Sequence, residues 1–212
     1  MNTQTQRLTL NGAVDVLEAL RDDPVLLPGV ASRGVAVIAH PHPLFGGTMN
    51  NKVVQTLARA FVQCGWSAVR FNFRGVGASA GLHDHGLGEA LDMRAVIEQV
   101  AAPGVPLALA GFSFGAFVTS HVVANEWTQR SVDKIVLVGT AASRFEVAPL
   151  PPEAHERALV IHGEVDETVP LAAVMNWARP QSLPVTVVPG CEHFFHGQLP
   201  LLKGLVVRHL QA

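Results

Sequence analysis

The chain has 212 residues, of which 49% are hydrophobic and 15% are charged. A composition this apolar excludes an extended disordered protein and predicts a single domain, residues 1–212, with a sizeable core. The formal net charge is -2 and the lysines and arginines are scattered, which argues against binding to nucleic acid or to an anionic membrane.

Targeting signals are not apparent in the sequence. The polar start MNTQTQR lacks the apolar core of a signal peptide, and no apolar run approaches the roughly 18 residues that a membrane helix requires. Cys64 and Cys191 lie far apart and show neither metal-binding nor redox spacing. We therefore expect a cytoplasmic protein with two free thiols.

Apolar periodicity divides the chain into alternating strands and helices. Asn11-Gly12 favours a tight hairpin turn between the first two strands. The expected elements are, in chain order, strands 8–10, 14–20 and 34–39, a helix capped by Asn50 or Asn51, strand 66–73, helix 87–100 with Leu91, Ala95 and Val100 on one face, strand 106–110, a helix to about 125, strands 134–139 and 158–162, helix 171–178, strand 185–188 and helix 199–210. This alternation predicts an α/β fold with a mostly parallel sheet.

The sequence Gly111-Phe112-Ser113-Phe114-Gly115 joins the strand at 106–110 to the helix that follows. Gly-x-Ser-x-Gly between a strand and a helix is the pattern of a nucleophile elbow, in which a tight turn lifts the serine hydroxyl above the sheet. The glycines allow strand and helix to approach closely. Ser113 is therefore the candidate nucleophile.

A serine hydroxyl needs a base to take its proton and a carboxylate to orient that base. The strand at 158–162 leads into a loop that offers Asp166 just before a helix. Glu164 and Glu167 flank this residue, but a carboxylate displaced along a tight loop would point elsewhere. We therefore choose Asp166 as the orienting carboxylate.

The last strand, 185–188, leads into a loop with two histidines, His193 and His196. The base should lie at the strand exit rather than at the start of the closing helix, so we choose His193. His196 is then expected to cap that helix or to lie at the edge of the core. Loops after parallel strands converge at the carboxyl edge of the sheet, where ligands bind in open α/β folds.

The oxyanion formed during acyl transfer needs backbone N–H donors. The N–H of Phe114, directly after the nucleophile, is the first candidate. The second should come from the loop that begins at His40-Pro41-His42-Pro43. Because prolines have no N–H, the candidates are His42, Leu44 and Phe45, of which we choose Leu44.

Four motifs together resemble the small, single-domain bacterial serine hydrolases of the α/β-hydrolase superfamily, over about residues 8–210. They are HPHPLFGGTMNNKV at 40–53, RFNFRGVGAS at 70–79, GFSFG at 111–115 and HFFHG at 193–197. The resemblance implies an α/β-hydrolase fold with an eight-stranded sheet, helices on both faces and an esterase-like triad.

These observations predict a carboxylesterase-like serine hydrolase that cleaves small esters or thioesters. A peptidase or acyltransferase with the same triad, and a non-catalytic binding protein, are the alternatives.

The connection at 139–157 is short and contains prolines, so we expect no cap domain. The turn at 75–81 lacks the dinucleotide spacing Gly-x-Gly-x-x-Gly, and Leu44 and Phe45 stand where a His-x-His metal site needs Asp and His. We therefore expect no cofactor and no metal.

Overall fold

The structure is a computed structural model that describes residues 5–27, 29, 31–127, 130 and 132–212. The strands are β1 (Gln6–Asn11), β2 (Val16–Asp22), β3 (Gly34–Ala39), β4 (Trp66–Phe71), β5 (Leu107–Phe112), β6 (Val132–Val138), β7 (Ala158–Gly163) and β8 (Val185–Val188). The α-helices are α1 (Lys52–Gln63), α2 (Leu87–Val100), α3 (Phe114–Glu126), α4 (Leu171–Ala178) and α5 (Leu199–Gln211). Short 3-10 helices lie at Pro43–Phe45, Pro152–Arg157 and Arg179–Gln181.

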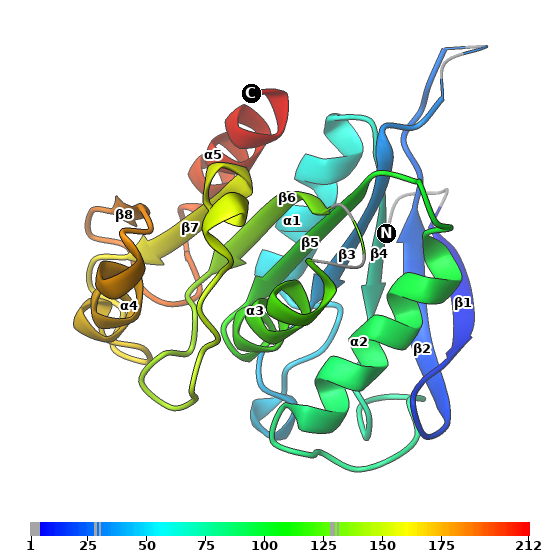
Figure 1. Cartoon of the computed structure of the whole chain (residues 1–212), viewed down its shortest axis with the longest axis horizontal. Helices are drawn as coiled ribbons and strands as arrows, with labels where there is room; N and C mark the ends of the chain where they lie inside the picture. Colours follow the sequence, from blue (N-terminus) through cyan, green and yellow to red (C-terminus); the bar gives the residue numbers. More distant parts are fainter. Residues whose placement is uncertain (1–4, 28, 30, 128–129, 131) are drawn as a thin grey trace.

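Within the described residues, one sheet contains eight strands in the order β1-β2-β4-β3-β5-β6-β7-β8 (Figure 1). The pairs β1–β2 and β2–β4 are antiparallel and all other pairs are parallel. The carboxyl ends of β3, β5, β7 and β8 therefore meet at one edge of the sheet. The predicted α/β-hydrolase architecture is confirmed.

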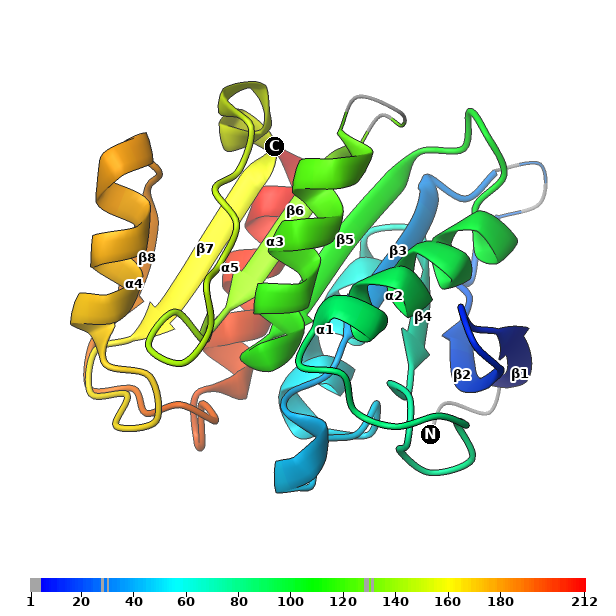
Figure 2. The same cartoon turned by 60° about the horizontal axis from the view of Figure 1, so that its bottom comes forward.

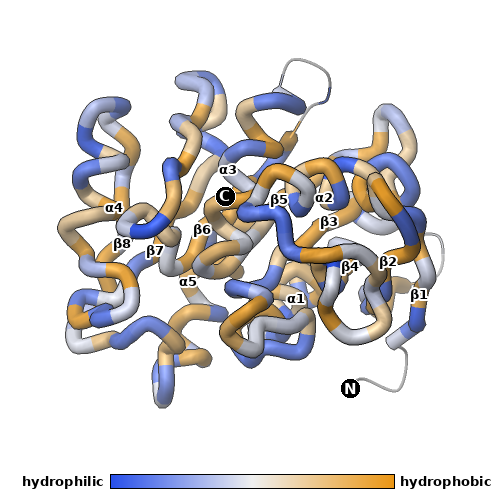
Figure 3. Tube along the Cα trace, turned by 90° about the horizontal axis from the view of Figure 1, so that it is seen from below, coloured by the Kyte–Doolittle hydropathy of each residue, from blue (hydrophilic) through white to orange (hydrophobic). Residues whose placement is uncertain are grey.

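Helices cover both faces of the sheet, with α2, α3 and α4 on one side and α1 and α5 on the other (Figure 2). Side chains of β5 alternate between the two layers: Leu107 and Leu109 pack on the α2–α3 side, and Ala108 and Ala110 on the α1–α5 side. Figure 3 shows hydrophobic positions gathered along the central strands. The continuous apolar runs of the sequence thus correspond to strands that are buried on both faces.

The amino-terminal hairpin forms, but its turn is longer than the sequence predicted. Asn11 still pairs with Val16, and residues 12–15 make the turn, closed by a 2.6 Å hydrogen bond from the N–H of Gly12 to the carbonyl of Asp15. Helix α2 holds this wider loop, because the side chain of Gln99 bonds both backbone groups of Asn11. Docking on α2 has overridden the local preference of Asn-Gly for a two-residue turn.

The predicted apolar face of α2 is only partly right, because Val100 packs against the core but Leu91 does not. Leu91 is 52% exposed, whereas Met93, Val96 and Ile97 are buried in the core. The helix is rotated so that the carboxylate of Asp92 also points inward, where it binds the guanidinium of Arg74 at 2.7 and 2.9 Å. A buried charge is costly without a partner, so this bidentate ion pair fixes the face that α2 presents to the sheet.

The connection between β6 and β7 forms no cap. Its regular structure is the single 3-10 helix Pro152–Arg157. The carboxyl edge of the sheet is therefore not covered by an inserted helical domain. Within the described part of the chain, no helix combines the length and the apolar character needed to cross a lipid bilayer.

Candidate active site

Ser113 occupies a strained turn between β5 and α3. Its φ of 57° and ψ of -115° are unfavourable for a side-chain-bearing residue. Two glycines make the turn possible: a Cβ at Gly111 would lie 2.3 Å from the carbonyl oxygen of Gly115, and one at Gly115 would lie 2.4 Å from that of Ala39. The N–H of Ser113 donates to the carbonyl of Val138 at 2.8 Å, which anchors the turn to β6.

A continuous hydrogen-bonded chain joins Ser113, His193 and Asp166. The Nε2 of His193 lies 3.0 Å from the Oγ of Ser113, and its Nδ1 lies 2.6 Å from the Oδ2 of Asp166. All three residues are buried. The imidazole packs on the ring of Phe112, with 4.9 Å between the ring centroids. The structure therefore brings together the three side chains that the sequence nominated.

The loop after β7 holds Asp166 in one orientation. Its Oδ1 accepts hydrogen bonds from the N–H groups of Thr168 at 2.9 Å and Val169 at 2.7 Å, which leaves Oδ2 for the imidazole. The competing acids point away: Glu164 accepts from the N–H of Gly190, and Glu167 is exposed. These bonds explain why only the middle carboxylate of the three reaches His193.

The expected role of His196 is wrong. Its side chain is 69% exposed and pairs with Glu192 at 2.8 Å, and the N-cap of α5 is Gln198. His196 therefore neither caps the helix nor joins the core. The difference arises because residues 193–198 form turns before α5 begins, so His196 faces solvent.

His162 is a site residue that sequence reasoning missed. This fully buried residue at the end of β7 has its Nε2 2.8 Å from the carbonyl oxygen of Val169 and 3.4 Å from the Oδ2 of Asp166. Burial lowers the pKa of His162, which favours the neutral ring. Its Nε2 proton then points to both oxygens and braces the carboxylate. A histidine at the end of an otherwise apolar strand was the one sequence feature that could have indicated this role.

The structure does not favour Leu44 as the second oxyanion donor. Its N–H already donates to the Nδ1 of His42 at 3.2 Å, and its side chain lies outside the cavity that contains Ser113 and is 68% exposed. The N–H of Phe45 donates to the carbonyl of His42. Among the described residues, the N–H groups of His42 and Phe114 have no such acceptor and both residues line the cavity. The local helical turn after His42 directs the N–H of Leu44 to the ring of His42.

His40 supports this loop from below as a neutral side chain. The ring is fully buried, its Nε2 accepts from the N–H of Phe73 at 3.0 Å, and its Nδ1 lies 2.6 Å from the carbonyl oxygen of Pro41. One proton on Nδ1 satisfies both contacts. Burial lowers the pKa of His40 to about 4. Its role is therefore structural.

We call the space around Ser113 and His193 the site cavity. It has a volume of about 410 Å³ and its aromatic walls come from Phe45, Phe114, Phe145 and Phe194, while Arg144 adds one guanidinium. Phe195, next to Phe194 in the chain, is instead buried in the core beside α5. A cavity of this size with mainly apolar walls suits a small organic substrate. Within the described residues, no group of three or more potential metal ligands is found.

Known proteins share this architecture. Residues 31–162 match the family model described as serine aminopeptidase, S33. An α/β serine hydrolase without lid from Xanthomonas campestris is 36% identical, with a TM-score of 0.86, over 100% of this chain and 95% of that chain. An α/β serine hydrolase homologue from Coxiella burnetii is 38% identical, with a TM-score of 0.81, over 97% of both chains.

A shorter match occurs with an uncharacterized protein of Rickettsia prowazekii. It is 44% identical over 92 residues, which span 42% of this chain and 39% of that protein. The family model, in contrast, covers β3 to β7 and so includes the elbow. Together with the two solved structures, it shows that this chain belongs to the lidless α/β serine hydrolases, in the family described as serine aminopeptidase, S33.

Proposed function

We propose that this protein is a carboxylesterase-like hydrolase that cleaves small esters or thioesters through an acyl-enzyme on Ser113. The observation that carries the proposal is the hydrogen-bonded chain from Ser113 through His193 to Asp166. Such a chain makes the hydroxyl nucleophilic, since the imidazole can take its proton while the carboxylate stabilises the resulting imidazolium.

In the acylation step, the Oγ of Ser113 attacks the substrate carbonyl carbon as the Nε2 of His193 takes the hydroxyl proton. The carbonyl oxygen becomes an oxyanion, for which we assign the N–H groups of Phe114 and His42 as donors, in place of Leu44. The carbon–oxygen or carbon–sulfur bond to the leaving group then breaks, and His193 gives its proton to the departing alcohol or thiol. The product is a serine ester.

Deacylation repeats these steps with water as the nucleophile. The water oxygen attacks the acyl carbon while His193 takes a proton from the water, and the same two N–H groups stabilise the second oxyanion. The bond to Ser113 breaks, and the hydroxyl regains its proton from His193. Asp166 remains ionised throughout and keeps the Nδ1 proton of the imidazole in place.

The charge of the site cavity favours an ester over the amino-terminal peptide bond that the family description would suggest. An aminopeptidase must hold the free ammonium group of its substrate, for which a carboxylate is the natural partner. The described residues that line the site cavity include no glutamate or aspartate, whereas Arg144 is present. A cationic substrate end would therefore face a like charge.

A panel of activated esters, thioesters and aminoacyl p-nitroanilides tests the proposal. We expect hydrolysis of p-nitrophenyl acetate and butyrate by the wild type, loss of this activity in Ser113→Ala, and kcat/KM at least a hundredfold lower for the aminoacyl anilides. Arg208→Gln, an exposed change on α5, serves as the control for purification and folding. Faster cleavage of the aminoacyl anilides would reject the ester assignment, and equal ester hydrolysis by Ser113→Ala would reject the mechanism.

A further inference from the structure

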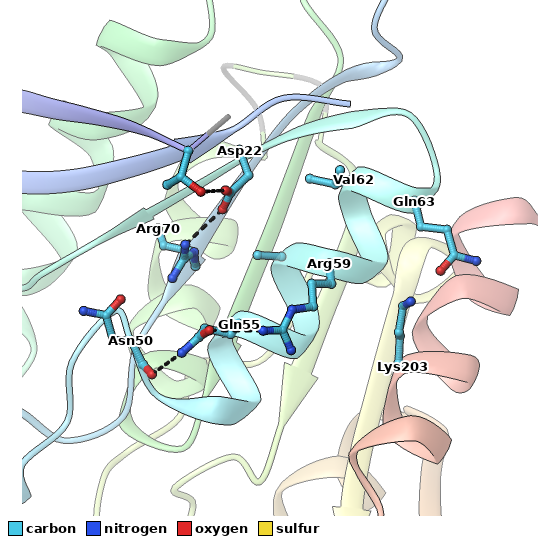
Figure 4. A pocket seen from close by; sticks show the side chains of 10 residues that line it. Asp22, Asn50, Gln55, Arg59, Val62, Gln63, Arg70 and Lys203 are labelled. Atoms are coloured by element: carbon cyan, nitrogen blue, oxygen red, sulfur yellow. Dashed lines mark hydrogen bonds and ion pairs between the residues drawn. The ribbon is translucent and has the colours of Figure 1, made fainter. Parts of the chain in front are cut away.

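A second and larger cavity, of about 700 Å³, lies beside helix α1, away from Ser113. Arg59 of α1, Arg70 of β4 and Lys203 of α5 contribute cations to its lining, and we call it the cation cavity (Figure 4). Its volume lies in the range of small-molecule sites. None of the residues that line it also lines the site cavity.

The fold explains why charged groups gather here. Trp66 and Ala68 of β4 belong to the core under α1 and α5, and Arg70 follows in the same two-residue alternation, so it faces the same layer. Helix α1 presents Arg59 from its exposed flank, and Lys203 approaches from α5 on the far side (Figure 4). Three separate elements thus direct cations at one space.

Acidic groups balance only part of the positive charge of the cation cavity. Asp22, the one carboxylate among the described residues that line it, binds the Nη2 of Arg70 at 2.9 Å. Within the described part of the chain, neither Arg59 nor Lys203 forms an ion pair. Three cations and one carboxylate leave a lining charge of +2 in a protein whose formal net charge is -2.

Arg70 supplies a buried donor that lacks a partner. Its Nη1 donates to the carbonyl of Met49 at 2.9 Å and its Nη2 is held by Asp22, but its buried Nε has no acceptor among the described residues. The side chain is 6% exposed. An unpaired buried donor costs free energy, which an incoming oxygen atom would recover.

The other polar groups of the cation cavity are already oriented. Gln55 donates to the carbonyl of Asn50 at 2.6 Å and accepts from the Nη2 of Arg59 at 3.3 Å, which orients the guanidinium (Figure 4). Lys203 extends toward Gln63 at the end of α1 (Figure 4). Arginine and lysine side chains that line one cavity are a usual means of binding phosphate.

We propose that the cation cavity binds a small molecule that carries a phosphate monoester. At neutral pH a phosphate monoester has a charge of about −1.5 to −2, which matches the lining charge of +2. Its oxygens would accept from Arg59, Lys203 and the Nε of Arg70. A monocarboxylate carries half of this charge and is therefore the weaker ligand. The site is independent of the proposed ester hydrolysis.

Calorimetric titration with phenyl phosphate, in buffer of constant ionic strength, tests this proposal. We expect saturable binding to the wild type, affinity at least tenfold lower in Arg59→Gln/Lys203→Gln, and less than a twofold change in Lys52→Gln/Arg208→Gln. The second pair removes the same charge from exposed positions on α1 and α5 that line neither cavity. Benzoate should bind at least fivefold more weakly than phenyl phosphate.

Absence of saturable phenyl phosphate binding overturns the proposal. Equal weakening by the two double variants also overturns it, because it would reduce the effect to general charge. Nitrogen-15 NMR of the wild type provides a reading that does not depend on variant folding. Saturable shifts of the side-chain N–H signals of Arg59 and Arg70 support the site, and their constancy on addition of phenyl phosphate rejects it.

Discussion

Two adjacent residues line different cavities: Asn51 lines the site cavity and Asn50 lines the cation cavity. The cation cavity is larger, at about 700 Å³ against about 410 Å³. Two of its three cations, Arg59 and Lys203, form no ion pair among the described residues, whereas the groups around Ser113 are joined in a directed chain of hydrogen bonds. The chemistry of each cavity therefore follows from the partners of its polar groups and not from its size.

The largest expected difference between the cavities is in catalysis. Ser113→Ala should lower kcat toward small esters roughly 10⁴- to 10⁶-fold, since the nucleophile of a triad is removed. Arg59→Gln/Lys203→Gln should change kcat less than twofold in phosphate-free buffer. Steady-state kinetics with p-nitrophenyl acetate measures both. A large loss in the double variant together with an active Ser113→Ala would reverse the assignment of the two cavities.

Asp166→Asn should have the next largest effect, a loss of about 10⁴-fold in kcat. The amide can still accept from Thr168 and Val169 but no longer stabilises the protonated His193 or fixes its tautomer. Glu167→Gln, an exposed change in the same loop, should retain wild-type kcat within twofold. Equal rates for Asp166→Asn and Glu167→Gln would remove Asp166 from the mechanism.

Protonation of His40 should destabilise the folded protein in acid. Because the pKa of His40 is about 4 in the folded protein, against an ordinary value of 6.5 for histidine, the folded state binds fewer protons than the unfolded chain between these values. The free energy of unfolding should therefore fall as pH decreases through 6.5 toward 4, by up to about 3 kcal/mol from this group.

Urea unfolding at several pH values measures this effect. His40→Asn has no ionisable ring and should be less stable at pH 7, but its free energy of unfolding should depend less on pH between 6.5 and 4. An identical pH dependence in wild type and His40→Asn would show that the ring is not the responsible group.

The smallest effect concerns acyl-chain length. No cap domain covers the site cavity, and its volume of about 410 Å³ leaves a long chain largely in water. Complete burial of one CH₂ group contributes about 0.8 kcal/mol to binding, and a CH₂ group that remains in water contributes nothing. We expect kcat/KM for p-nitrophenyl butyrate to exceed that for the decanoate about tenfold. A preference for the decanoate would contradict the proposed small substrates.

Local patterns predicted the bounds of several elements well. Strand Gly34–Ala39 and helix Leu87–Val100 have the bounds expected from the sequence, and Asn51 caps α1 through a 2.9 Å hydrogen bond from the N–H of Val53. The order of strand, tight turn and helix around Ser113 was equally readable, because the elbow requires glycines at fixed spacing.

The face that α2 buries depends on a contact between separate segments, the pair between Asp92 and Arg74. The choice of Leu44 depends on a local contact, because its N–H donates to the ring of His42 two residues earlier. Hydrophobic periodicity contains neither interaction. The cation cavity was not predicted for the same reason, since Arg59, Arg70 and Lys203 meet only after folding.

Covalent labelling with a fluorophosphonate, followed by peptide mass spectrometry, tests whether Ser113 is a nucleophile activated by His193. We expect one adduct, on Ser113, that forms at least a hundredfold more slowly in His193→Ala and is absent in Ser113→Ala. Arg208→Gln should label at the wild-type rate. An adduct on another serine, or labelling of Ser113 that is unaffected by His193→Ala, would contradict the proposed triad.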